Sequence, residues 1–88
     1  MPEINVLLIT QPDCGHCESA KLVLEKLAKE FPLAVRIVGL DTDEGGALAD
    51  RGGILFPPGL FLDGEPFSYG RPSERKLRKT LEQRFARA

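Results

Sequence analysis

A strand, a helix and a second strand follow one another within the first 40 residues, and this order constrains the fold more than any other feature. Residues 4–10 form a nearly continuous aliphatic run, which is typical of a strand buried on both faces. From Cys14 onward apolar residues recur every three or four positions, and Pro32 predicts that this helix ends near Phe31. Residues 33–40 are rich in β-branched side chains and indicate another strand. Two strands joined in this way are expected to be parallel, with a right-handed crossover.

The remainder of the chain carries shorter elements separated by turn signals. Potential capping side chains precede a predicted short helix over roughly residues 44–50. The pair Asp63-Gly64 between two apolar runs is a strong hairpin signal. Residues 60–62 and 66–69 are therefore expected to form an antiparallel pair of strands.

A last helix is expected near the C-terminus. Ser73 can cap it, and its apolar face would be formed by Leu77, Leu81 and Phe85. A chain of 88 residues is long enough for one compact domain and too short for two. The prediction is a single α/β domain over residues 1–88 with the order β-α-β-α-β-β-α, in which helices flank a central four-stranded mixed sheet.

Charge and composition narrow the classes of partner. Twelve Lys and Arg against thirteen Asp and Glu give a formal net charge of −1, which does not favour nucleic acid as a partner. No apolar run approaches the length of a membrane span, and no secretory signal peptide is visible. Two cysteines in a chain without an export signal indicate redox or metal chemistry and not a structural staple. A cytoplasmic protein is therefore expected. We also expect a monomer.

The two cysteines lie in the tetrapeptide Cys14-Gly15-His16-Cys17, where the first strand leads into the first helix. The unpaired backbone N–H groups and the dipole of a helix N-terminus favour an anion there. They would favour the Cys14 thiolate, which is the species that attacks a disulfide. A spacing of three residues on a helix brings the Cys17 sulfur within bonding reach of Cys14.

The different positions of the cysteines on this helix suggest different roles. Cys14 precedes the regular helix and can be exposed, whereas Cys17 falls on the apolar face. We therefore expect Cys14 to attack a substrate disulfide and Cys17 to resolve the mixed disulfide. His16 would further favour the thiolate, and Asp13 would oppose it. The alternative function is a module that binds or transfers copper, zinc or an iron–sulfur cluster through the same cysteine pair.

The sequence resembles the thioredoxin superfamily, and more closely its short glutaredoxin-like branch. The resemblance rests on the strand leading into C-G-H-C and on the segment from Pro58 to Gly64, which is similar to the glutaredoxin pattern P-x-x-F-x-[ND]-G. It implies a thioredoxin-like fold and a thiol-disulfide oxidoreductase that acts on protein or small-thiol substrates without a cofactor or bound metal. It also implies that Pro58 follows a cis peptide bond, lies against the cysteine pair and shapes the substrate groove, and that Pro57 contacts substrate. Pro57 departs from the family pattern because proline has no N–H to donate.

Two further residues bear on the electron donor that the resemblance implies. Gln11 occupies the position before the cysteines where glutaredoxins usually carry a lysine, and Arg71 could reach a carboxylate of glutathione. Both are candidate substrate-binding residues. The glutathione-binding signature of glutaredoxins is absent, and so is the tryptophan that thioredoxins place before their cysteines. The donor is expected to be a flavoprotein reductase or glutathione, with the reductase favoured.

Overall fold

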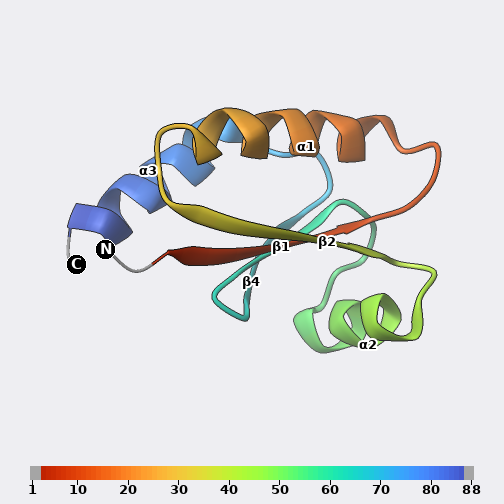
Figure 1. Ribbon diagram of the computed structural model, residues 1–88. Coiled ribbons are helices and arrows are strands. Elements are labelled where there is room, and N and C mark those ends of the chain that lie inside the picture. Colours follow the sequence, from red (N-terminus) through yellow and green to blue (C-terminus); the bar gives the residue numbers. More distant parts are fainter. Residues whose placement is uncertain (1–2, 87–88) are drawn as a thin grey trace.

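Seven elements follow one another in the predicted order in the computed structural model, which describes residues 3–86 (Figure 1). They are β1 (Ile4–Thr10), α1 (Gly15–Ala28), β2 (Leu33–Gly39), α2 (Asp43–Gly52), β3 (Gly59–Leu62), β4 (Glu65–Tyr69) and α3 (Glu74–Ala86). The predicted domain bounds at positions 1 and 88 lie outside the described residues. Within residues 3–86, no helix combines the length and the hydropathy that crossing a membrane requires.

The four strands form one mixed sheet in the order β2-β1-β3-β4. Strands β1 and β2 are parallel in regular register from Ile4 opposite Leu33 to Thr10 opposite Gly39. Strand β3 is antiparallel to both β1 and β4. Helices α1 and α3 cover one face of the sheet and α2 covers part of the other (Figure 1). The predicted α/β fold class and the mixed four-stranded sheet are confirmed.

The alternation of side chains along β1 divides the core into two layers. Ile4, Val6 and Leu8 face α1 and α3 and belong to the larger cluster. Its other buried members are Ala20, Leu24, Leu27, Leu60, Leu62, Leu77 and Leu81. On the opposite face Ile9 packs with Ala49 and Phe61 in a much smaller cluster. The α2 face of the sheet is therefore only partly covered.

The observed limits of α1 and α2 differ from the predicted ones. Helix α1 ends at Ala28 and not near Phe31, because the chain tightens into a turn in which Glu30 donates its N–H to the carbonyl of Leu27. Phe31 still packs against the core. Helix α2 runs two residues beyond Asp50, to Gly52, and Gly53 caps it in the left-handed region at φ 67°.

The first turn of α2 packs so closely against the end of β2 that position 45 requires a glycine. A Cβ at this position would lie 1.9 Å from the carbonyl oxygen of Gly39, which ends β2. The close approach holds α2 against the end of the sheet. The turn at Asp63-Gly64 joins β3 to β4. Asp63 and Gly64 have φ angles of 49° and 84°, and the two strands pair antiparallel, which confirms the predicted hairpin.

Candidate active site

Three loops meet at one end of the sheet and build the candidate site. Strand register aligns Ile9 of β1 with Gly59 of β3, and Gly59 in turn with Tyr69 of β4. The loop that follows β1 carries the cysteine pair, the loop that precedes β3 carries Pro57 and Pro58, and the turn after β4 begins at Gly70. These segments are far apart in the sequence and are brought together by the antiparallel pairing of β1 with β3.

Cys14 is the N-cap residue of α1, with extended backbone angles at φ −111° and ψ 106°. Its Sγ accepts a hydrogen bond from the backbone N–H of Cys17 across 3.2 Å. The two cysteines form a disulfide, with 5.2 Å between their Cα atoms. The chain is therefore described in its oxidised state, and the reactive sulfur lies where the N-terminal N–H groups of a helix converge.

The two sulfurs differ in exposure, as the sequence predicted. Cys17 is 2% exposed and lies within the core, whereas Cys14 is only partly buried. Gly15 and His16 are both exposed on the first turn of α1. Asp13 precedes the pair in the left-handed region at φ 56°. Cys14 is thus the more accessible end of the disulfide, and Cys17 is enclosed by the core.

The peptide bond between Pro57 and Pro58 is cis, as the family resemblance implied. Pro58 is fully buried, and its carbonyl oxygen accepts a hydrogen bond from the N–H of Gly70 across 2.9 Å. Pro57 is partly exposed. The bond between Pro58 and Gly70 joins the loop before β3 to the turn after β4.

An aromatic pair beside these prolines was not identified as functional from the sequence. The rings of Phe56 and Tyr69 meet edge to face, with their centroids 5.0 Å apart. Phe56 is 54% exposed, Tyr69 is 41% exposed, and the adjacent Leu55 is 75% exposed. The available signal was an apolar run, Ile54 to Phe56, that ends at two prolines and so cannot continue as a buried strand.

The structure also places the two remaining candidate residues. Gln11 directly follows β1, and Arg71 directly follows Gly70, so both belong to the loops at this end of the sheet. Both side chains are exposed. Their roles in binding substrate remain predictions, as does the electrostatic role of His16.

The residues around the cysteines do not form a metal-binding cluster. Within residues 3–86, no three side chains of histidine, cysteine, aspartate or glutamate are grouped so that they could hold an ion. A structural zinc site normally needs four such ligands. The disulfide engages both cysteines, and the alternative of a metal-binding module is not favoured.

Comparison with curated proteins gives relatives along nearly the whole chain. A thioredoxin of Methanocaldococcus jannaschii is 31% identical over 85 residues, which cover 97% of this chain and all of that protein. A protein of Archaeoglobus fulgidus that is named as a probable thioredoxin is 33% identical over 80 residues, covering 91% of this chain and 88% of its own length. The NADPH-dependent thioredoxin reductase 3 of Arabidopsis thaliana is 33% identical over 57 residues, which are only 11% of that protein. No family model matches the chain.

A solved structure supports the same assignment. A singly substituted thioredoxin of Halobacterium salinarum NRC-1 superposes with a TM-score of 0.71 at 29% sequence identity. The match covers 92% of this chain and 74% of that one. Since homology over almost the full length accompanies the fold and the C-x-x-C pair at the start of α1, this chain belongs to the thioredoxin family of thiol-disulfide oxidoreductases.

Proposed function

We propose that this chain reduces or exchanges disulfides of protein substrates, with Cys14 as the attacking thiolate and Cys17 as the resolving thiol. The observation that carries the proposal is the unequal exposure of two bonded sulfurs. Cys17 is 2% exposed, and Cys14 caps α1 at the surface. A substrate sulfur can therefore approach Cys14 but not Cys17.

The reaction begins with the pair reduced. The Cys14 thiolate attacks one sulfur of the substrate disulfide, the substrate S–S bond breaks, and the released thiolate takes up a proton. The Cys17 thiol loses its proton and attacks the Cys14 sulfur of the mixed disulfide. The mixed disulfide breaks, the second substrate thiol leaves, and the Cys14–Cys17 disulfide remains. Two electrons have then passed from the chain to its substrate, together with the Cys17 proton, and solvent returns the proton that it took up when Cys14 ionised.

Backbone groups at the start of α1 would stabilise the attacking species. Cys14 Sγ already accepts the N–H of Cys17, and the positive end of the helix dipole acts on the same atom. We propose that His16 adds to this effect and that Asp13 opposes it. The ultraviolet absorbance of the thiolate in the reduced protein, compared with a His16→Gln variant, measures the contribution of His16.

We propose that the substrate is a protein segment with apolar residues beside its disulfide. Leu55, Phe56 and Tyr69 present exposed apolar surface at the end of the sheet that carries Cys14. Aromatic side chains of this kind are frequent anchors in interfaces because they offer a large area with few rotatable bonds. Pro57 can offer substrate only its carbonyl oxygen, so side-chain contacts must supply much of the binding.

We further propose that a flavoprotein reductase returns the chain to its dithiol form. The similarity to a segment of an NADPH-dependent thioredoxin reductase supports this donor over glutathione, and the absent glutathione signature points the same way. Cysteine usage suggests the cytoplasm as its compartment, where reducing systems keep such pairs available. We expect the chain to act as a monomer.

A redox titration of the purified protein in glutathione buffers tests the proposal. Samples are acid-quenched, alkylated and weighed intact by mass spectrometry. The expected result is a reversible two-electron transition between dithiol and the Cys14–Cys17 disulfide, within roughly −270 to −120 mV. A lasting glutathione adduct at Cys14 would reassign the donor to glutathione. No reversible transition, together with metal in the isolated protein, would overturn the oxidoreductase in favour of metal binding.

A further inference from the structure

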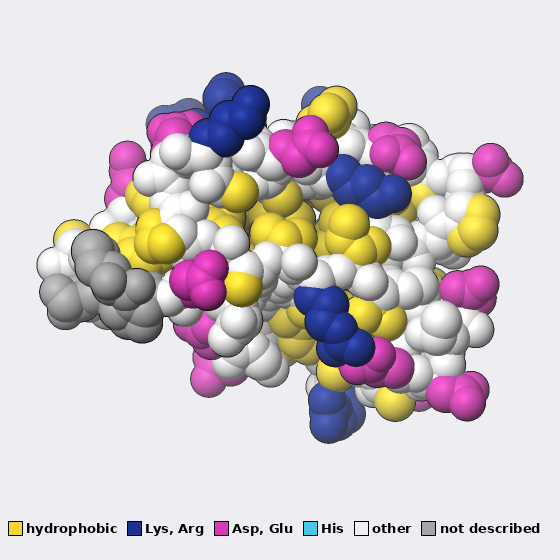
Figure 2. Space-filling view, viewed as in Figure 1, with side chains coloured by type: hydrophobic (Ala, Val, Ile, Leu, Met, Phe, Trp, Pro, Cys, Tyr) yellow, Lys and Arg dark blue, Asp and Glu magenta, His cyan; other side chains and the backbone are white. Residues whose placement is uncertain are grey.

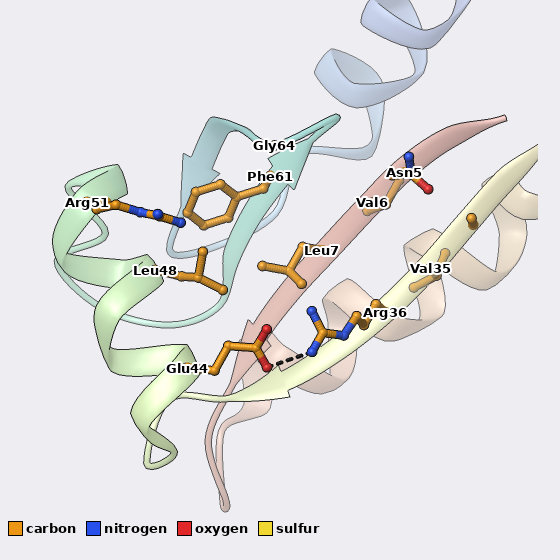
Figure 3. A pocket seen from close by; sticks show the side chains of 11 residues that line it. Asn5, Val6, Leu7, Val35, Arg36, Glu44, Leu48, Arg51, Phe61 and Gly64 are labelled. Carbon is orange, nitrogen blue, oxygen red and sulfur yellow. Dashed lines mark hydrogen bonds and ion pairs between the residues drawn. The ribbon is translucent and has the colours of Figure 1, made fainter. Parts of the chain in front are cut away.

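Exposed apolar surface alone does not identify a substrate-binding residue in this chain. Figure 2 shows hydrophobic side chains exposed along β2, where Val35 and Ile37 are 40% and 51% exposed. A hollow of about 400 Å³ on the α2 face is lined in part by Leu48 and Phe61 (Figure 3). None of the residues that line this hollow belongs to the loops around Cys14. A residue that serves the site must therefore be identified by how it is held there.

The Phe56 ring is held in one place although it lies outside the core. More than half of the side chain is exposed, and it packs in neither core cluster of residues 3–86. The ring meets Tyr69 edge to face, which is a favourable geometry for two aromatic side chains. It also lies against Gly70, the residue that follows Tyr69.

Gly70 provides the space that this ring occupies. It is buried, and its φ angle is 77°. A Cβ at position 70 would lie 2.6 Å from Cε2 of Phe56 and 3.5 Å from two further atoms of the ring. Because the ring is the far end of an exposed, flexible side chain, it would move more easily than the backbone of Gly70. Any residue other than glycine at this position would therefore displace the Phe56 ring.

Gly70 also holds the residue on the other side of Pro57. Its N–H donates a hydrogen bond to the carbonyl oxygen of Pro58 across 2.9 Å. The two residues that flank Pro57 in the sequence, Phe56 and Pro58, thus both contact this one glycine. Pro57 is the residue that the family resemblance implies contacts substrate. Gly70 is therefore placed to fix the segment that substrate would meet.

We propose that Gly70 is a positioning residue for protein substrates, and that it acts by holding the Phe56 ring in place beside Pro57. This inference rests on the proposed function, in which Phe56 and Tyr69 contact an apolar segment of the substrate. A side chain that is already ordered in the free protein loses less conformational entropy on binding than a mobile one. Substitution of Gly70 should therefore weaken the binding of protein substrates and leave the chemistry at Cys14 intact.

A spectroscopic test shows whether Gly70 holds the ring. Tyr69 is the only tyrosine of the chain, which has no tryptophan, so the tyrosine band of near-ultraviolet circular dichroism reports on the aromatic pair. Gly70→Ala should change this band to that of the Phe56→Ala variant, because a displaced ring no longer packs against Tyr69. An unchanged band in Gly70→Ala would overturn the proposal.

Gly64→Ala is the matched control for backbone strain. Gly64 has a similar φ angle of 84°, but no atom lies within 4 Å of the position of its Cβ. It lies in the turn of the β3–β4 hairpin, at the end of these strands opposite Tyr69 (Figure 3). Gly64→Ala therefore carries similar strain and should leave the tyrosine band unchanged. A change as large as that in Gly70→Ala would show that strain, and not the displaced ring, is responsible.

Steady-state kinetics then show whether the position of the ring matters for substrate. Gly70→Ala should raise KM for insulin about fivefold and leave kcat within about twofold of wild type. In a protein that already carries Phe56→Ala, the same change should raise KM little further, because there is no ring to displace. A further rise of about fivefold in that background would mean that Gly70 acts without Phe56, and would overturn the proposal.

The inference and the proposed function can fail separately. Gly70→Asn replaces Gly70→Ala if the alanine variant folds poorly, because asparagine tolerates a positive φ better and still carries a Cβ. If wild type reduces insulin and the KM of the Gly70 variant equals that of wild type or of Gly64→Ala, the role of Gly70 alone is wrong. If wild type reduces neither insulin nor a small aromatic disulfide, the proposed function itself is wrong.

Discussion

The backbone N–H of Cys17 lies 3.2 Å from the Sγ of Cys14, so the residue that caps α1 also carries the accessible sulfur. A cap normally uses an oxygen side chain to satisfy the first N–H groups of a helix. Here a sulfur takes that place. Helix formation and reactivity are thereby linked at a single atom.

The first prediction concerns the two cysteine variants. Cys17→Ser should accumulate a mixed disulfide between Cys14 and a protein substrate, because the resolving thiol is missing. Cys14→Ser should form almost none, since Cys17 is buried. Each reduced variant is incubated with insulin. The amount of mixed disulfide is then measured by non-reducing electrophoresis and by intact mass spectrometry. An adduct that forms at Cys17 in the Cys14→Ser variant at a comparable rate would contradict the assigned roles.

A second prediction concerns the aromatic pair. Phe56→Ala should lower kcat/KM for insulin about fivefold, because exposed aromatic residues that anchor an interface commonly contribute more than 1 kcal/mol. The activity of the Phe56→Ala variant on a small aromatic disulfide should change little, because such a substrate has no protein segment to bind. Stability should stay within about 0.5 kcal/mol, since more than half of the Phe56 side chain is exposed.

Leu22→Ala provides the matched control for Phe56→Ala. Leu22 is 66% exposed, but it lies on α1 beyond the first turn and away from the loops that form the site. Its truncation should leave activity on both substrates unchanged. If the two variants lose the same activity on insulin, the aromatic pair has no special role in binding substrate.

A third prediction compares two neighbouring glycines of α2. Gly45→Ala should destabilise the protein by about 1–3 kcal/mol, because its Cβ would collide with the backbone oxygen of Gly39. Gly46→Ala should be neutral or stabilising by up to about 1 kcal/mol, because its nearest contact would be an ordinary 3.8 Å. Urea denaturation measures both. Equal effects would show that α2 can move away from β2 at little cost.

A fourth prediction concerns the ion pairs that Arg78 of α3 forms with Glu30, in the turn after α1, and with Glu74. Arg78 donates two hydrogen bonds to Glu30 and a third to Glu74. The hydrogen bond from Arg78 lowers the pKa of Glu30. Hydrogen bonds from Lys26 and then from Arg78 lower the pKa of Glu74. Carboxylates with a lowered pKa stabilise the fold above their ordinary value of 4.5, and this contribution disappears as the pH falls through the lowered values.

Arg78→Gln should therefore lower Tm by a few degrees at neutral pH, and the difference from wild type should shrink below pH 4.5. Thermal unfolding followed by circular dichroism across this pH range measures it. Arg75→Gln serves as the control, because Arg75 is exposed on the same helix and forms no ion pair within residues 3–86. A difference that is independent of pH would mean that Arg78 acts through packing alone.

Local patterns predicted most of the fold because the elements are regular. Residues 4–10 became β1 without change, and the Asp63-Gly64 turn placed the hairpin correctly. The same periodicity predicted the buried position of Cys17. The helix ends were less predictable, since the turn after Ala28 depends on how Phe31 reaches the core.

The features that the sequence did not predict depend on contacts between residues that are far apart in the chain. The meeting of Phe56 with Tyr69 depends on the register of β3 and β4, which local periodicity does not specify. Arg78 and Glu30 are 48 residues apart, and only the packing of α3 against α1 brings them together. The exposure of Val35 and Ile37 follows from the position of β2 at the edge, although their β-branched sequence predicts only a strand.

The burial of Cys17 also has a kinetic consequence under the proposed mechanism. Because Cys14 is the accessible sulfur, the oxidised protein must be attacked there by its reductase, and the reduced protein must attack its substrate with the same atom. The two partners cannot be bound there at once. Turnover should therefore follow ping-pong kinetics, with parallel lines in double-reciprocal plots. Either partner in excess should inhibit by competing with the other for the same binding site at Cys14.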